Sequence, residues 1–174
     1  MRKTDGSKML YWTVIQLEEW RLIAAATEEG LVYVAREEEL YGQFRRWKEK
    51  HYPSAECVRD EKRMQPYAEA LQAYWEGRSK TFDIPAVSHG TQFQQRVWDE
   101  LKRIAYGETS SYAEIARRIG KPEALRAAGR AIGANPLLIV VPCHRVISRT
   151  GALTGYSGGL DLKKRLLEIE GRLV

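Results

Sequence analysis

The first forty positions of the chain carry an apolar pattern that is typical of strands. Residues 9–17 are rich in aromatic and β-branched side chains, and the pattern repeats in residues 20–26 and 31–35. The last two runs are separated by Glu28-Glu29-Gly30, a turn signal. Such runs, bounded by turn residues, are typical of antiparallel strands. We therefore expect a small antiparallel sheet at the amino-terminal end.

A helical period follows this sheet. Residues 37–52 place Leu40, Phe44 and Trp47 on one face, which predicts an amphipathic helix. A second helix is expected over residues 65–75, ending at Gly77, and residues 82–85 form a short extended piece. We place a domain boundary after residue 88. Residues 1–88 are then an amino-terminal structural α/β domain, and residues 89–174 form a second, mainly helical domain.

The second domain begins with a predicted helix over residues 91–104, whose apolar side chains recur at helical spacing. Ser111 and Glu114 fit a capping box, in which each side chain satisfies the other's backbone donor at a helix start. That helix ends at Gly120, and another is expected over residues 123–133. Two short helices joined by a glycine-containing turn indicate a helix-turn-helix. The second helix is rich in Ala and Gly, which favours either close helix packing or close approach to a nucleic-acid groove.

A short apolar run, residues 137–141, predicts a buried strand that ends at Pro142. Cys143 follows, so it lies where the chain leaves the sheet. It is either a small buried apolar residue or a nucleophile whose thiolate form is favoured by the neighbouring His144 and Arg145. Neighbours on a strand point to opposite faces. Either the chain turns here, or a water carries the proton from Cys143 to His144.

The last segment supplies a carboxylate. Residues 161–170 read as a helix with Gly171 as its terminator, so Glu170 lies in the last turn, where the helix dipole disfavours an anion. Glu170 either orients His144, as the third member of a nucleophile–base set, or is simply exposed. The loop before it, residues 151–159, holds four glycines with Tyr156 and Ser157. It is either a pocket wall or a plain connector.

Charge changes this picture more by its placement than by its size. The net charge is +5, and residues 96–149 hold ten Lys or Arg against five Asp or Glu. The rest of the chain holds 18 of each sign and is neutral. A positive surplus confined to one part of the chain indicates a polyanion partner, or else a solvated basic face.

Composition excludes several classes of protein. With 44% hydrophobic residues the chain can build an ordinary core, and no run is long enough to span a membrane. The first residues lack the apolar stretch of a signal peptide, so we expect a cytoplasmic protein. Two cysteines and three histidines match no zinc spacing, although His51 and Cys57 are near each other. We expect neither a disulfide nor a metal nor any other cofactor.

In order along the chain, these signals resemble one family. Pro142-Cys143-His144-Arg145-Val146, followed by Gly151-Ala152 and Tyr156-Ser157-Gly158-Gly159, resembles the active-site signature of the O6-alkylguanine-DNA alkyltransferases. Residues 126–129 with Asn135-Pro136, and the segment around Tyr112, are similar to the helix-turn-helix of that family. The similarity covers roughly residues 64–171. Ala105 stands where the family often has proline, which affects only a helix end.

The resemblance implies a fold and an activity. The fold would be α+β, with a ribonuclease H-like amino-terminal domain and a winged-helix carboxy-terminal domain. The activity would be DNA repair by direct damage reversal: Cys143 takes an alkyl group, such as methyl, from O6 of guanine or O4 of thymine, once. The partner would be double-stranded DNA containing O6-alkylguanine, bound by a monomer.

The resemblance also implies residue roles. Cys143 would be the acceptor, His144 its base through a water, and Glu170 the group that orients His144. Tyr112 would bind the flipped guanine and help to protonate it as it leaves. Arg126 would fill the gap that the flipped nucleotide leaves in the base stack. Asn135 would tie the DNA-reading helix, residues 123–133, to the active-site strand. The expected DNA and substrate contacts also include Tyr156, Ser157 and Arg145.

Two other functions remain open from the residues alone. A non-catalytic lesion-binding or regulatory protein would use the basic helices and not Cys143. A thiol hydrolase would use Cys143, His144 and Glu170 without DNA.

Overall fold

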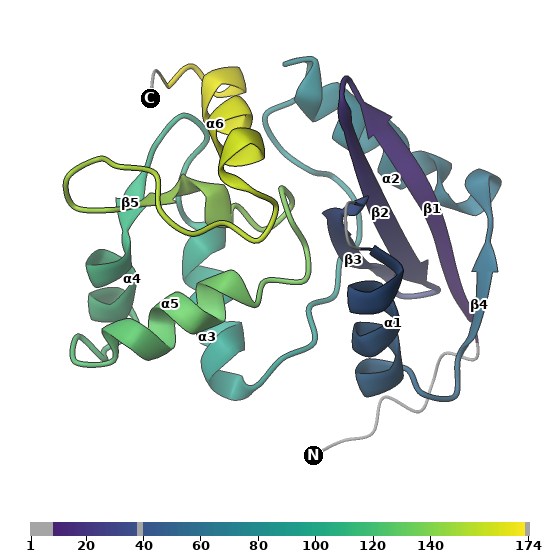
Figure 1. The fold of residues 1–174 in the computed structure, drawn as a ribbon, viewed down its shortest axis with the longest axis horizontal. Coiled ribbons are helices and arrows are strands. Elements are labelled where there is room, and N and C mark those ends of the chain that lie inside the picture. The colour runs from purple at the N-terminus through teal and green to yellow at the C-terminus, as the bar shows by residue number, and fades with distance from the viewer. Residues whose placement is uncertain (1–8, 38–39, 173–174) are drawn as a thin grey trace.

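The computed structural model describes residues 9–37 and 40–172. Its strands are β1 (Met9–Leu17), β2 (Trp20–Thr27), β3 (Gly30–Arg36), β4 (Glu56–Arg59), β5 (Ser110–Ser111) and β6 (Val146–Ile147). Its α-helices are α1 (Leu40–His51), α2 (Glu61–Trp75), α3 (Gln92–Lys102), α4 (Tyr112–Arg118), α5 (Leu125–Gly133) and α6 (Leu160–Ile169), and η2 (Cys143–Arg145) is a 3-10 turn. The sheet lies on one side of Figure 1, and α3 to α6 lie on the other.

The amino-terminal sheet has the strand order β3-β2-β1-β4. β1 pairs with β2 and β2 with β3 in antiparallel fashion, as the apolar runs and the turn signal predict, whereas β4 joins β1 in parallel. Alternate residues of β2 face opposite sides: Leu22 and Ala24 join a core that includes Leu71 of α2, and Ile23 joins one that includes Phe44 of α1. The sheet is therefore buried on both faces.

Two elements of the first half differ from the expectation. β4 was not predicted, because its Glu56, Val58 and Arg59 surround Cys57 without an apolar alternation. α2 begins four residues earlier than expected, since Asp60 caps it by accepting a hydrogen bond from the backbone N–H of Arg63. Carboxylate caps of this kind satisfy backbone donors that the first turn leaves free.

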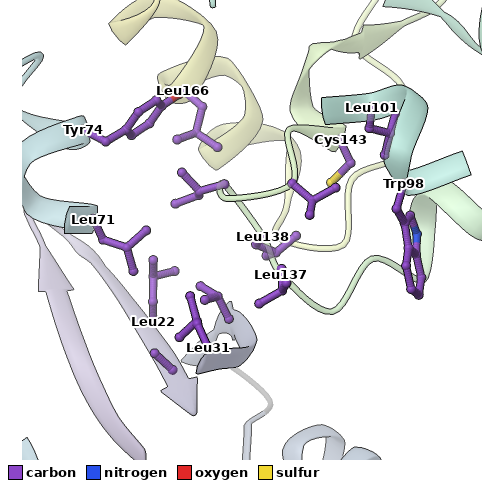
Figure 2. Packing of buried hydrophobic residues seen from close by; sticks show 14 of the residues in the cluster. Leu22, Leu31, Leu71, Tyr74, Trp98, Leu101, Leu137, Leu138, Cys143 and Leu166 are labelled. Atoms are coloured by element: carbon purple, nitrogen blue, oxygen red, sulfur yellow. The ribbon is translucent and has the colours of Figure 1, made fainter. Parts of the chain in front are cut away.

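The edge strand β3 joins the two halves of the chain. Val34 donates its backbone N–H to the carbonyl of Pro136 at 2.8 Å, and Leu138 returns one to the carbonyl of Val34 at 3.1 Å. The same core continues across this junction, from Leu71 through Leu137 and Leu138 to Cys143 (Figure 2). The segment before Cys143 is thus held against the sheet by both hydrogen bonds and apolar packing.

The helix-turn-helix is present with shorter helices than expected. α4 ends before Gly120, whose φ of +74° suits a helix C-terminus, and α5 starts at Leu125. The capping box is only half formed: Ser111 accepts from the backbone of Glu114, but the Glu114 carboxylate binds Arg117 and Arg118 instead. Two guanidinium donors compete successfully with one backbone N–H for a carboxylate.

The strand predicted over residues 137–141 is wrong. Leu137 forms an isolated bridge to Val34, and a turn follows, with hydrogen bonds from Val140 to the Leu138 carbonyl and from Val141 to the Leu137 carbonyl. Burial explains why a strand was predicted, because a buried turn and a buried strand have the same apolar composition. Ile139 has a φ of +72°, a conformation that is costly for a β-branched residue.

Candidate active site

Asn135 holds the turn that leads to Cys143. It lies just beyond α5, and its side chain is buried. Its Oδ1 accepts the backbone N–H of Leu137 at 2.9 Å, while Nδ2 donates to the carbonyl of Val141 at 2.9 Å. One side chain thus closes both ends of the turn and fastens the strained Ile139 between them. Nδ2 also lies 3.2 Å from Sγ of Cys143.

Cys143 occupies the first position of the 3-10 turn η2, so the chain turns at the cysteine rather than continuing as a strand. Only 3% of the residue is exposed. Burial raises the pKa of its thiol to about 11, even though the Asn135 hydrogen bond and the charge of Lys163 lower it. At neutral pH the thiol is therefore protonated, and nucleophilic reaction requires a base that removes its proton.

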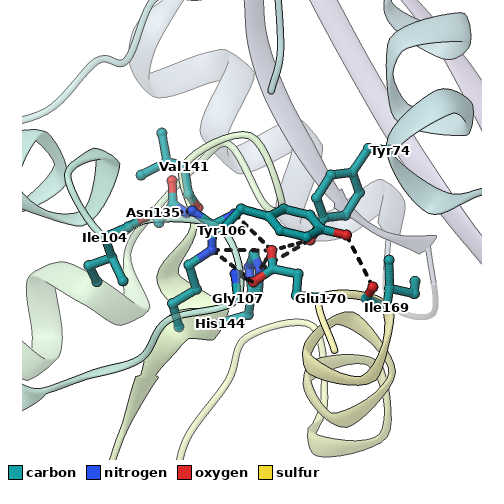
Figure 3. A network of polar contacts seen from close by, with 10 residues as sticks. Tyr74, Ile104, Tyr106, Gly107, Asn135, Val141, His144, Ile169 and Glu170 are labelled. Carbon is teal, nitrogen blue, oxygen red and sulfur yellow. Dashed lines mark hydrogen bonds and ion pairs between the residues drawn. The ribbon is translucent and has the colours of Figure 1, made fainter. Parts of the chain in front are cut away.

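A buried network of Glu170, His144, Arg145 and Tyr74, which we call the carboxylate network, includes the two residues that follow Cys143 in the chain. Figure 3 shows Glu170 with His144 and Tyr74 next to it. Oε1 of Glu170 lies 2.9 Å from Nε2 of His144 and 2.8 Å from Nη2 of Arg145, and Nε of Arg145 donates to Oε2 at 2.9 Å. Burial on its own raises the pKa of Glu170, but the hydrogen bonds from His144 and Arg145 bring it down to about 2. Glu170 is thus an anion that accepts hydrogen bonds only.

This arrangement fixes the proton of His144. Because Glu170 can only accept, Nε2 of His144 carries the hydrogen, and Nδ1 has a free lone pair. Burial lowers the pKa of the imidazole below its usual value, against the raising effect of Glu170, so His144 is neutral at physiological pH. Its Nδ1 is buried and has no hydrogen-bond partner among the described residues. A neutral imidazole with a free nitrogen can act as a base.

The other predicted site residues surround this centre. The hydroxyl of Tyr156 is buried, close enough to Cys143 to interact electrostatically, and has no hydrogen-bond partner in the described part of the chain. Ser157 is exposed next to it. The hydroxyl of Tyr112, at the start of α4, donates to the Thr154 carbonyl at 3.0 Å and so joins the helix-turn-helix to the glycine-rich loop.

Arg126 projects from the surface of α5, next to the exposed Leu125. The opposite side of the helix packs inward through Ala128 and Ala131, and Nε1 of Trp98 donates to the Ala131 carbonyl at 2.8 Å. The small residues of one face therefore let α5 pack closely on α3, whereas the exposed face carries Leu125, Arg126 and Arg130.

Arg145 does not lie where we expected it. Its side chain is buried, and its donors are used by Glu170 and by the carbonyl of Ile104, which Nη1 reaches at 2.6 Å. A phosphate contact would require breaking this ion pair in the protein interior. Arg145 instead compensates the charge of Glu170.

Two buried residues of the site were not among the candidate functional residues of the sequence. Tyr74 lies on the apolar face of α2, so the sequence indicates an ordinary core residue, yet its hydroxyl donates a hydrogen bond to Glu170. Lys163 reads as a solvated helix residue, but it is fully buried in α6 and donates to the carbonyls of Val146 at 2.6 Å and Thr154 at 3.0 Å. Burial lowers its pKa to about 8. Lys163 thereby links the strand after the cysteine to the glycine-rich loop.

Within residues 9–37 and 40–172, no group of three or more His, Cys, Asp or Glu side chains could hold a metal ion. No helix in this part of the chain is both long and apolar enough to cross a bilayer. A hollow of about 510 Å³ lies between the segment after α3, β5, α4 and β6, and its lining includes Arg103, Arg118 and Arg149 together with Glu108 and Glu114, but not Cys143.

Fold and site together define a mixed α+β protein in which a helix pair stands beside a buried cysteine with an imidazole–carboxylate partner. The family model described as the DNA-binding domain of 6-O-methylguanine DNA methyltransferase matches residues 92–172. The inducible methylated-DNA–protein-cysteine methyltransferase of Bacillus subtilis (strain 168) is 45% identical over 163 residues, which cover 94% of this chain and 91% of that protein. The chain belongs to the methylated-DNA–protein-cysteine methyltransferase family.

Solved structures agree with this assignment. The O6-methylguanine methyltransferase of Mycobacterium tuberculosis is 40% identical with a TM-score of 0.79, and 93% of each chain is covered. The structure of the Mycobacterium tuberculosis OGT in complex with DNA has a TM-score of 0.80 at 39% identity, and 92% of each chain is covered.

Proposed function

We propose that this protein repairs DNA by moving an alkyl group from O6 of guanine, or O4 of thymine, to Cys143. The sulfur forms a bond to the alkyl carbon, the bond from that carbon to O6 breaks, and its electron pair stays on the base. The thiol proton passes to Nδ1 of His144 through a water. The departing guanine takes a proton from the Tyr112 hydroxyl, and exchange with solvent then returns Tyr112 and His144 to their neutral forms. The thioether product has no hydrolytic exit, so each molecule reacts once.

One observation carries this proposal. A thiol with a raised pKa lies directly before a neutral histidine whose Nε2 hydrogen is bound by an anionic Glu170 and whose Nδ1 is free. Nucleophile, base and orienting carboxylate are the three parts of an activated nucleophile. Because Nδ1 has no hydrogen-bond partner among the described residues, a bridging water would satisfy it and transmit the proton.

DNA as the substrate rests on the family and on the surface around α5. An alkyl group on O6 is inside the duplex, so the nucleotide has to be flipped out at a cost of about a few kcal/mol. Arg126, exposed on α5, would occupy the gap in the stack. Tyr156 and Ser157 would line the guanine pocket, and Asn135 ties α5 to the turn before Cys143. The basic surplus of residues 96–149 makes binding sensitive to salt.

We propose that the chain acts as a monomer and divides at residue 88. Residues 1–88 would be a ribonuclease H-like structural domain, and residues 89–174 a winged-helix domain for DNA binding and alkyl transfer. The short strand pair β5–β6 and the helix pair α4–α5 support the second description.

The test is to incubate the protein with a duplex containing O6-methylguanine and to measure its intact mass. We expect a gain of one methyl group per protein, located on the Cys143 peptide and absent in Cys143→Ala. Binding without a mass change would instead indicate a lesion-binding protein. Repeated turnover of substrate by an unmodified protein would indicate a hydrolase.

A further inference from the structure

Tyr74 connects the amino-terminal half of the chain to the candidate catalytic base. It comes from α2, which packs against β1, and it is fully buried. Its hydroxyl oxygen lies 2.5 Å from Oε1 of Glu170 and 3.3 Å from Nε2 of His144 (Figure 3). A tyrosine almost a hundred residues before Glu170 thus enters the same small cluster of polar atoms.

The direction of the hydrogen bond follows from the charges. Glu170 is ionised and can only accept, while burial and the nearby Glu170 raise the pKa of the Tyr74 phenol, which keeps its proton. Tyr74 therefore donates to Oε1. That oxygen also accepts from Nε2 of His144 and from Nη2 and Nε of Arg145, so three side chains from two segments, α2 and η2, converge on it.

We infer that Tyr74 is a positioning residue for alkyl transfer: its hydroxyl holds the Glu170 carboxylate in the orientation that keeps the hydrogen of His144 on Nε2. This inference rests on the proposed function. Without the Tyr74 hydroxyl, Oε1 loses its donor from the amino-terminal half, and only Arg145, His144 and a long 3.4 Å contact from the backbone N–H of Gly107 hold the carboxylate in line with the imidazole. With Tyr74 in place the free lone pair of His144 stays on Nδ1, where the thiol proton is received. The amino-terminal half thereby contributes to the chemistry of the carboxy-terminal half.

The substitution Tyr74→Phe isolates this hydroxyl. The ring packs on Phe82, with centroids 5.2 Å apart, and edge-on against Tyr106 at 6.0 Å, and a phenyl ring keeps both contacts. Tyr106→Phe is the matched control. The Tyr106 hydroxyl donates to the backbone carbonyl of Ile169 at 3.1 Å, at the same helix end, but not to the Glu170 carboxylate.

Single-turnover rates are measured on an O6-methylguanine duplex and on free O6-benzylguanine, together with the duplex Kd. We expect Tyr74→Phe to slow both reactions by the same factor, about tenfold for one hydrogen bond to a charged group, at unchanged Kd. Tyr106→Phe should stay within about twofold of the parent protein, because it leaves the carboxylate network intact.

A spectroscopic measurement separates positioning from mere packing. The chain has three histidines, so ¹⁵N imidazole resonances can be assigned with His51→Gln and His89→Gln. We expect His144 to be the Nε2–H tautomer in the parent protein and in Tyr106→Phe, and to populate the Nδ1–H tautomer in Tyr74→Phe. Equal rates and equal tautomers in the two variants would overturn the positioning role. If the parent protein transfers no alkyl group, the proposed function itself fails, which is a different result.

Discussion

Removing the charge of Glu170 perturbs stability and reactivity by different routes. In Glu170→Gln the guanidinium of Arg145 stays buried, with 9% of its side chain exposed, and loses its counter-ion. Breaking a buried ion pair from one side costs about 3–5 kcal/mol, because an uncompensated charge is left in the interior. Loss of a neutral hydrogen bond would cost about 1 kcal/mol. We expect the free energy of unfolding to fall by the larger amount.

The double variant Arg145→Met/Glu170→Gln removes both charges. Replacing a buried pair by uncharged side chains of similar volume is about neutral. The double variant should therefore recover most of the stability that Glu170→Gln loses. Urea unfolding followed by tryptophan fluorescence measures both values, and a change in midpoint at constant m-value reports stability alone.

Alkyl transfer should remain slow in the double variant, because glutamine no longer stabilises the imidazolium that forms as His144 takes the thiol proton. The expected loss lies between about tenfold and the roughly 10⁴-fold effect of the equivalent change in the serine protease triad. Equal stability of the single and double variants would refute the ion-pair argument. Recovery of the rate together with the stability would show that Glu170 acts only as the counter-ion of Arg145.

Four further predictions address the thiol, the turn and the DNA surface. Burial lowers the pKa of His144, so the alkyl-transfer rate of the parent protein should be flat above pH 6.5 and fall only below it. In His144→Gln the rate should instead rise about tenfold per pH unit towards the Cys143 pKa of about 11, because only the thiolate then reacts. A pH series of single-turnover rates checks this, and parallel profiles would contradict it. Asn135→Ala should cost about 1–3 kcal/mol for the buried groups left without a partner, and it should raise the thiol pKa further; urea unfolding and thiolate absorbance measure the two effects. Arg126→Ala should slow repair of duplex DNA at least about tenfold but leave reaction with free O6-benzylguanine unchanged, since only the duplex has a gap to fill; equal losses would remove this role. At neutral pH iodoacetamide should modify the exposed Cys57 and spare Cys143, which peptide mapping would show.

The sequence predicts the local elements well where the pattern has one interpretation. β1, β2 and β3 alternate or run apolar between clear turn residues, and their antiparallel pairing is confirmed. The run from Leu137 to Val141 predicted a buried strand, and its apolar composition could not distinguish a strand from a buried turn. Its actual turn depends on Asn135, whose contacts with the backbone of both ends exist only in the folded chain.

Site residues that are adjacent in sequence could be found, whereas those brought in by packing could not. Cys143 and His144 are adjacent in the sequence, and Glu170 is a candidate because an anion at a helix C-terminus is unfavourable. Tyr74 sits at a core position of α2, and its distance to Glu170 depends on how that helix docks. Lys163 has no signal, because a buried lysine and a solvated one occupy the same helix positions in sequence.

The burial of Cys143 gives its reactivity a specific origin. A surface thiol with a low pKa would react with any soft electrophile, and a protein that reacts once would lose its only acceptor in that way. Here burial holds the thiol in its inert, protonated form at neutral pH, and under the proposed function His144 is the base that removes its proton. Arg145 compensates the charge of Glu170, so the base keeps an anionic partner in the interior without an unpaired charge. Selectivity then comes from the alkyl carbon that the pocket delivers to the sulfur, since proximity and orientation are worth far more than the nucleophilicity that burial removes.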